Sequence, residues 1–252
     1  MTGSDTMLDV DIRTQPDDMT CGPTALHAVY GYWGDHIPLS EVIGQVTTLE
    51  SGGTIPTFLA CHALERGYHV RLYTYNLQVL DPSWFNLGES DIPQRLKQQA
   101  QYKKDARLQA ATRGYLRFLA LGGELRFENL DRKLIRSYLT NGIPLLSGLS
   151  STYLYKSVRE YGVDSIEDDI RGQPAGHFVV LSGYDPEQKS VTIADPYRHN
   201  PVAGKAYYAV EIDRVICSIM LGVLTFDAAL IVIRPQNRVT GKRPSQLFSS
   251  KE

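Results

Sequence analysis

The order of the predicted elements indicates an α+β fold, with N-terminal helices packed on a C-terminal antiparallel sheet. Apolar residues recur at helical spacing in three early segments, which are 22–33, 39–46 and 57–65. Apolar, β-branched runs bounded by Gly or Pro predict five later strands, which are 143–149, 177–183, 190–194, 206–212 and 228–233. Helices followed by strands is the order of an α+β domain. The 252 residues, 42% of them apolar, suffice for one large core.

The boundaries of the early elements have local causes. Pro23 suits the first turn of helix 22–33, because the N–H that proline lacks would have no helical partner there. Gly67 ends the helix 57–65. The segment 69–75 alternates weakly and is rich in aromatic and β-branched residues, so we predict one further strand there.

The segment 82–128 differs in composition from the rest of the chain. After Pro82 and Pro93 it is rich in Gln, Lys, Arg and Ala, and 92–121 predicts one long helix or two helices. We therefore predict a single domain over 1–252, with a helical insertion at about 82–128 and a polar tail from about 235. The insertion is either a lid that narrows a substrate cleft or a helix that extends the core.

Composition and charge exclude several classes of function. A net charge of −2 argues against a nucleic-acid partner, and no Gly-rich phosphate-binding motif occurs. The three cysteines form no CxxC pair, so we expect neither a disulfide framework nor a zinc site, and no cofactor. The N-terminus has no apolar signal run and no segment is apolar enough to span a membrane, so we expect a cytoplasmic protein. Nothing in the sequence indicates the oligomeric state.

Cys21 is the first candidate for chemistry, because it lies where a loop becomes a helix. Backbone N–H groups and the helix dipole favour an anion there, and the thiolate is the reactive form of cysteine. Gly22 allows close approach of backbone or substrate. Gln15, six residues earlier, carries an amide that could donate to an oxyanion beside the sulfur. The competing interpretations are a buried packing cysteine and an exposed glutamine.

His177 and Asp195 flank a predicted hairpin. His177 begins an apolar strand and Asp195 ends the next one, with a turn at Asp185-Pro186 between them. A turn centred on Pro186 predicts that His177 and Asp195, nine residues to either side, lie directly opposite each other on one face. Such a carboxylate would orient the imidazole as a base. A slip of one residue would separate the two side chains, so the prediction depends on the register.

Three motifs carry a resemblance to a known family. They are Gln-x5-Cys-Gly-Pro-x-Ala-Leu from Gln15, Gly-His-Phe-Val-Val-Leu around His177, and Ile-x-Asp-Pro around Asp195. Together they resemble the C39-like peptidases, which are papain-like cysteine proteases best known for processing bacteriocin leader peptides. The resemblance implies a papain-like fold, Cys21 as nucleophile, His177 as base, Asp195 as orienting acid and Gln15 in the oxyanion hole.

We therefore predict a cysteine peptidase that hydrolyses a peptide or amide bond in a peptide or protein substrate. Two alternatives remain open at this point. One is a deamidase or amide transferase that uses the same residues, and the other is a peptide-binding module without turnover. Cys61 and His62 are neighbours on a predicted helix and point about 100° apart, so we expect them to pack rather than react, and we expect Cys217 in the core.

Overall fold

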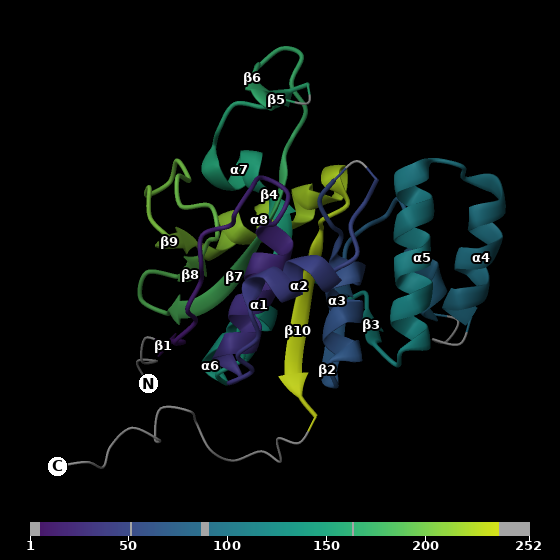
Figure 1. The fold of residues 1–252 in the computed structure, drawn as a ribbon, viewed down its shortest axis with the longest axis horizontal. Coiled ribbons are helices and arrows are strands. Elements are labelled where there is room, and N and C mark those ends of the chain that lie inside the picture. The colour runs from purple at the N-terminus through teal and green to yellow at the C-terminus, as the bar shows by residue number, and fades with distance from the viewer. Residues whose placement is uncertain (1–5, 51, 87–90, 163, 237–252) are drawn as a thin grey trace.

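The computed structural model describes residues 6–50, 52–86, 91–162 and 164–236, and a sheet of eight strands forms its centre (Figure 1). Seven strands lie in the order β3-β2-β10-β4-β7-β8-β9, and β1 pairs with β7. Every neighbouring pair is antiparallel except β2 and β3. The strands are β1 (Thr6–Met7), β2 (Tyr68–Thr74), β3 (Glu124–Arg126), β4 (Leu145–Ser150), β7 (Gly176–Asp185), β8 (Ser190–Ala194), β9 (Tyr207–Glu211) and β10 (Ala229–Pro235).

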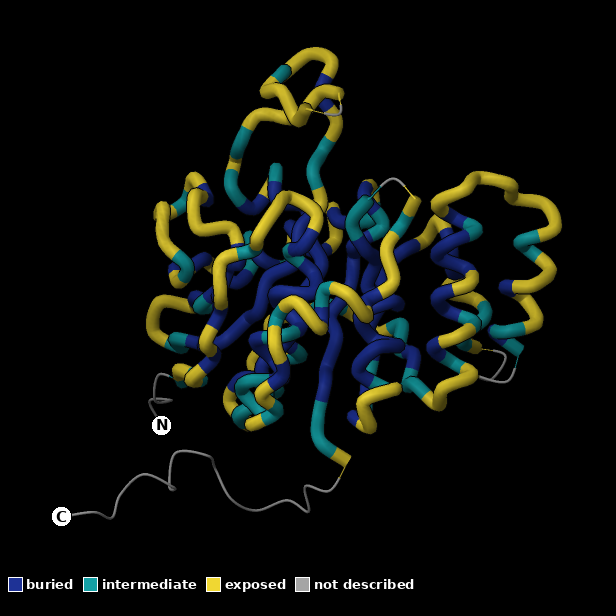
Figure 2. The backbone as a smooth tube through the Cα atoms, in the orientation of Figure 1, coloured by how far each residue is buried: buried dark blue, intermediate teal, exposed yellow. Residues whose placement is uncertain are grey.

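Helices cover both faces of this sheet. One face packs against α1 (Cys21–Tyr32), α3 (Pro56–Glu65) and α5 (Ala106–Ala120), and the other against α6 (Arg132–Thr140) and α8 (Ile212–Leu221). Strand β7 therefore directs apolar side chains to both sides, which explains its continuous apolar sequence. In Figure 2 the central strands of this sheet are buried while the outer loops are exposed. The α+β fold class is confirmed.

Shorter elements complete the chain. They are α2 (Leu39–Gln45), a 3-10 turn η1 (Pro82–Asn86), α4 (Ile92–Tyr102), α7 (Ser151–Tyr155), the small hairpin β5 (Glu160–Tyr161) with β6 (Ile166–Glu167), and η3 (Gly222–Thr225). The hairpin projects from the top of the molecule in Figure 1. Within the described ranges, no helix has the length and apolar character needed to cross a membrane.

The region predicted as one or two helices contains two, α4 and α5. Asp105 separates them, because its side chain accepts a hydrogen bond from the N–H of Leu108 and caps α5. The prediction is incomplete after strand 206–212: it assigned no element to the next residues, yet α8 begins at Ile212. Ile212, Val215 and Ile219 are buried at helical spacing, a period that the continuous apolar stretch concealed. The predicted polar tail falls largely at 237–252, outside the described residues.

Helix α1 is held close to strand β7 by a glycine. A Cβ atom at Gly22 would lie 2.6 Å from the Thr54 methyl group and 3.2 Å from the rings or methyl groups of Leu59 and Phe178. No larger residue fits without displacing these neighbours. The first residue of α1, Cys21, is thereby brought to the end of β7 at which His177 lies.

Candidate active site

Cys21 is the first residue of α1, and no side chain caps the helix at this end. Thr20 occupies the N-cap position, but its hydroxyl donates back to the carbonyl oxygen of Asp17 at 3.2 Å. Pro23 has no N–H, so the first turn presents the backbone N–H groups of Cys21 and Gly22 without a side-chain partner. Cys21 is half-buried and lines a cavity of about 210 Å³.

His177 contacts both Cys21 and Asp195. Its Nε2 donates to Oδ1 of Asp195 at 2.9 Å, and the Cys21 side chain lies near enough to the imidazole to raise its pKa. Because Asp195 takes Nε2, Nδ1 is the ring nitrogen that remains for Cys21. His177 is 7% exposed and Asp195 is 1% exposed, so bulk water competes little for either group.

The contact between His177 and Asp195 is present, but the predicted register is wrong. Asp185 pairs with Ser190 across a longer turn, and a bulge between Leu181 and Gly183 shifts the ladder by one residue. Beyond the bulge Leu181 pairs with Ile193, so the ladder, if continued, would set Asp195 opposite residue 179 and diagonal to His177. Without the extra residue Ser182, Asp195 would face away from the histidine.

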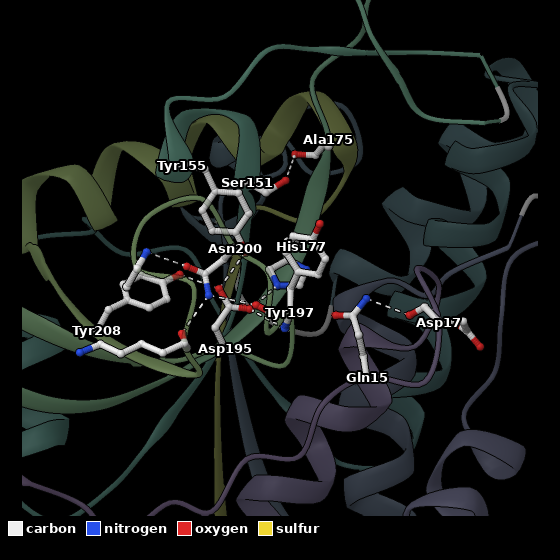
Figure 3. A network of polar contacts seen from close by, with 12 residues as sticks. Gln15, Asp17, Ser151, Tyr155, Ala175, His177, Asp195, Tyr197, Asn200 and Tyr208 are labelled. Atoms are coloured by element: carbon white, nitrogen blue, oxygen red, sulfur yellow. Dashed lines mark hydrogen bonds and ion pairs between the residues drawn. The ribbon is translucent and has the colours of Figure 1, made fainter.

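Asp195 accepts four hydrogen bonds. Oδ1 binds His177 and the backbone N–H of Tyr197 at 2.8 Å, while Oδ2 binds the hydroxyls of Tyr155 at 2.8 Å and Tyr208 at 2.5 Å. Figure 3 shows the three tyrosines gathered around Asp195 and His177. A buried carboxylate that is fully hydrogen-bonded is held in the ionised form and in one orientation.

The sequence analysis did not identify these tyrosines. Tyr208 pairs with Ile193 in the β8–β9 ladder, so a register for the second predicted hairpin could have placed it beside Asp195. Tyr155 ends the short helix α7, for which the N-cap Ser150 is the local sequence signal that the analysis did not use.

Charges within the site shift three ionisation equilibria. Burial lowers the pKa of His177, but Asp195 and Cys21 outweigh burial and raise it to about 10. Burial raises the pKa of Asp195, yet the charge of His177 and the tyrosine hydroxyls bring it below the usual value. Burial and the negative charge of Asp195 raise the pKa of Tyr155, which therefore remains a hydrogen-bond donor. The site thus favours an imidazolium ion beside an ionised carboxylate.

Gln15 lies in the loop that leads into α1 (Figure 3). Its backbone N–H donates to the carbonyl of Pro196 at 3.0 Å, which ties this loop to the residue after Asp195. Its Nε2 donates to the carbonyl of Asp17 at 2.8 Å, while Oε1 is buried without a hydrogen-bond partner. An amide nitrogen carries two hydrogens, so Gln15 retains one donor beyond the bond to Asp17.

The remaining cysteines lie away from this cluster. Cys61 is buried, and its neighbour His62 binds the Tyr30 hydroxyl at 2.7 Å and Gln45 at 3.1 Å, as expected for packing residues. Cys217 is exposed on α8, so its predicted place in the core is wrong: it falls on the outward face of a helix that we had not expected. No group of three or more potential metal ligands occurs among the described residues.

The sequence profile of the Peptidase_C39 like family matches residues 7–213 of the chain. No curated protein matches it by sequence. Its structure is similar to a double glycine motif protease from an AMS/PCAT transporter, solved with the leader peptide (14% identity, TM-score 0.43, 92% of this chain and 99% of that one). It is also similar to the peptidase domain of Streptococcus ComA (12%, 0.43, 90% and 99%) and to xylellain, a cysteine protease from Xylella fastidiosa (16%, 0.43, 93% and 87%).

Proposed function

Because this chain belongs to the Peptidase_C39 like family, whose members are cysteine peptidases, we propose that it hydrolyses peptide bonds with Cys21, His177 and Asp195 as its catalytic residues. One observation carries the proposal: the imidazole of His177 is hydrogen-bonded to the buried carboxylate of Asp195 and lies near enough to Cys21 for the thiol group to raise its pKa. A nucleophile, a base and a group that orients the base are the parts that covalent acyl transfer requires.

The reaction proceeds in two acyl-transfer steps. The Cys21 sulfur attacks the carbonyl carbon of the scissile bond, and the C–N bond breaks as the imidazolium of His177 gives its proton to the leaving amine. A thioester on Cys21 results. Neutral His177 then removes a proton from water, the hydroxide oxygen attacks the thioester carbonyl, and the acid product leaves as the thiol is restored. Asp195 keeps the imidazole oriented and stabilises its charged form.

The negative oxygen that forms in both steps needs hydrogen-bond donors. The uncapped N-terminus of α1 supplies the backbone N–H of Cys21, and Gln15 supplies the second hydrogen of its Nε2. Two preorganised donors of this kind typically accelerate acyl transfer by about 10²–10³ for each donor. The bond from Gln15 to Asp17 and the backbone bond to Pro196 hold the side chain in place.

The segment 82–128 is proposed to be a helical insertion in the single catalytic domain. Its second helix, α5, combines the two possibilities that the sequence left open, a helix of the core and an element that borders the substrate cleft. Gly114 and Phe118 of α5 are buried, and a Cβ at Gly114 would lie 2.1 Å from the Thr57 hydroxyl of α3, so α5 is part of the core. Arg107, in its first turn, lines the same cavity as Cys21. We propose that only this end of α5 borders the substrate.

The experiment compares the wild type, Cys21→Ala and Cys217→Ala on a mixture of peptides of known sequence. We expect the wild type and Cys217→Ala to release peptide fragments, and mass spectrometry of the quenched wild type to detect an acyl group on Cys21. Cys21→Ala should release none while its thermal unfolding stays unchanged. A reducing compartment such as the cytoplasm would keep all three cysteines in the reduced thiol form.

The products also separate the alternatives. Released ammonia or a new amide bond, without chain cleavage, would indicate a deamidase or an amide transferase. Peptide binding without any product would indicate a binding module. Full cleavage activity in Cys21→Ala would contradict the mechanism.

A further inference from the structure

The cavity beside Cys21 contains a second buried carboxylate that the mechanism above does not use. Asp227 lies between η3 and β10 and is 4% exposed. It lines the cavity of about 210 Å³ together with Cys21, Arg107 and Phe178. The volume lies below the roughly 300–1,000 Å³ of sites for small organic ligands, and it suits one long side chain of a peptide.

The fold makes room for this carboxylate. A Cβ atom at Gly176 would lie 1.8 Å from Oδ2 of Asp227, and one at Gly148 would lie 2.2 Å from its carbonyl oxygen. Phe226 before it adopts a left-handed backbone conformation with φ 66°, and the N–H of Asp227 donates to the carbonyl of Gly222 at 2.8 Å. Two close glycines and a strained turn therefore place the carboxylate of Asp227 next to Gly176, the residue that precedes His177.

The charges of Arg107 and His177 act on Asp227, but neither residue forms an ion pair with it. Among the described residues it takes part in no ion pair. The guanidinium of Arg107 donates to the carbonyl of Thr225 at 2.7 Å and lies 5.2 Å from the ring centre of Phe226, and His177 is bound to Asp195. A buried carboxylate without an ion-pair partner is costly, and a cation that enters the cavity would reduce the cost.

We propose that Asp227 is a specificity-determining residue, which binds the ammonium or guanidinium group of a Lys or Arg side chain near the scissile bond of the substrate. The inference rests on the proposed peptidase function, since it assigns the cavity beside Cys21 to the substrate. The preferred substrates are then peptides with a basic residue at one fixed position relative to the cleaved bond. Asp18 also lines this cavity, but it is exposed, so solvent screens its charge.

A pH effect follows from the surroundings of Asp227. Burial raises its pKa to about 7, against the opposing effects of Thr225, Arg107 and His177. The charged and titratable groups around it are Arg107 from α5, His177 from β7, Cys21 from α1 and Asp18 from the preceding loop. The carboxylate form, which binds a cation, therefore becomes dominant as the pH rises through neutrality.

The experiment uses a peptide library cut from a proteome by a glutamate-specific protease, so that Lys and Arg remain inside the peptides. Mass spectrometry of the products from the wild type should show Lys or Arg enriched at one position around the cleaved bonds. A matched pair of synthetic peptides, with Lys or its neutral isostere norleucine at that position, then gives the ratio of kcat/KM values. We expect a ratio of at least about 10 for the wild type and close to 1 for Asp227→Asn.

Controls keep the outcomes separate. Asp18→Asn, at the same cavity, should change the ratio by less than about threefold, as for a charge that remains solvated. In the wild type the ratio of the two kcat/KM values should rise between about pH 6 and 8. Ionisation of the catalytic residues affects both peptides equally, so it does not change this ratio. This measurement also serves if Asp227→Asn fails to fold.

Cleavage with no basic preference, or with a preference that Asp227→Asn retains, would overturn this inference and leave the proposed function intact. Absence of any cleavage by the wild type would overturn both.

Discussion

Replacing Tyr208 with phenylalanine removes one hydroxyl group from the buried carboxylate of Asp195. The hydroxyl donates to Oδ2 at 2.5 Å, and among the described residues the other donor to Oδ2 is Tyr155 at 2.8 Å. Asp195 is 1% exposed, so water cannot take the vacated place. A hydrogen bond to a charged group contributes about 1.5–3 kcal/mol, and we expect Tyr208→Phe to lower the free energy of unfolding by that amount. Tyr155→Phe/Tyr208→Phe should cost more than either change alone.

The pH dependence of this effect has a definite sign. The pKa of Asp195 is lowered in the folded state, so its interactions stabilise the protein above the unfolded pKa of about 4 and are lost as the pH falls through the folded value. The difference between the wild type and Tyr208→Phe should therefore be complete at pH 7 and shrink in acid.

Urea denaturation at pH 7, followed by circular dichroism, measures this difference. Tyr102→Phe is the matched control, because Tyr102 is 84% exposed and surface substitutions usually stay within about 0.5 kcal/mol. An effect of Tyr208→Phe no larger than that of the control would refute the reasoning that Oδ2 depends on this donor.

The remaining predictions concern thiol reactivity, glycine packing and the charge of the histidine. Iodoacetamide should label Cys21 first and Cys61 last, because burial raises the pKa of the Cys61 thiol to about 12; equal labelling in peptide mass spectra would contradict this. Gly176→Ala should abolish activity or folding, since its Cβ would lie 1.8 Å from a carboxylate oxygen, whereas Gly31→Ala in α1, with nothing within 4 Å, should raise the free energy of unfolding by about 0.5–1 kcal/mol in denaturation assays. The pKa of His177 is raised to about 10, so its stabilising charge should be complete below about pH 6.5 and lost as the pH rises through 10. A constant difference in unfolding free energy between the wild type and His177→Gln over that range would argue against the ion pair.

Several features could be predicted because their causes are local. Pro23 and the apolar spacing after it predict the helix that begins beside Cys21, and the structure begins α1 at that residue. Strand β2 also follows from a short-range pattern, since Gly67 separates it from the helix before it. Helix α8 was not predicted, because strand β9 passes directly into it at Ile212 and the apolar residues there show neither the strand period nor the helix period clearly.

The sequence by itself determined which residues are the candidates for the chemistry: a cysteine at a helix start, a histidine that opens an apolar strand and an aspartate that ends the next. Tertiary structure decided how they meet. The turn between β7 and β8 is longer than predicted, and by itself it would place Asp195 on the opposite face of the sheet from His177. The extra residue in β7, Ser182, returns Asp195 to the face of His177, and no local sequence pattern predicts such a bulge. Tyr155, Tyr208 and Asp227 reach the site from α7, β9 and the turn before β10, segments far apart in the chain. Their positions depend on the packing of the whole sheet, because a buried carboxylate is stable only where distant donors or cations converge on it.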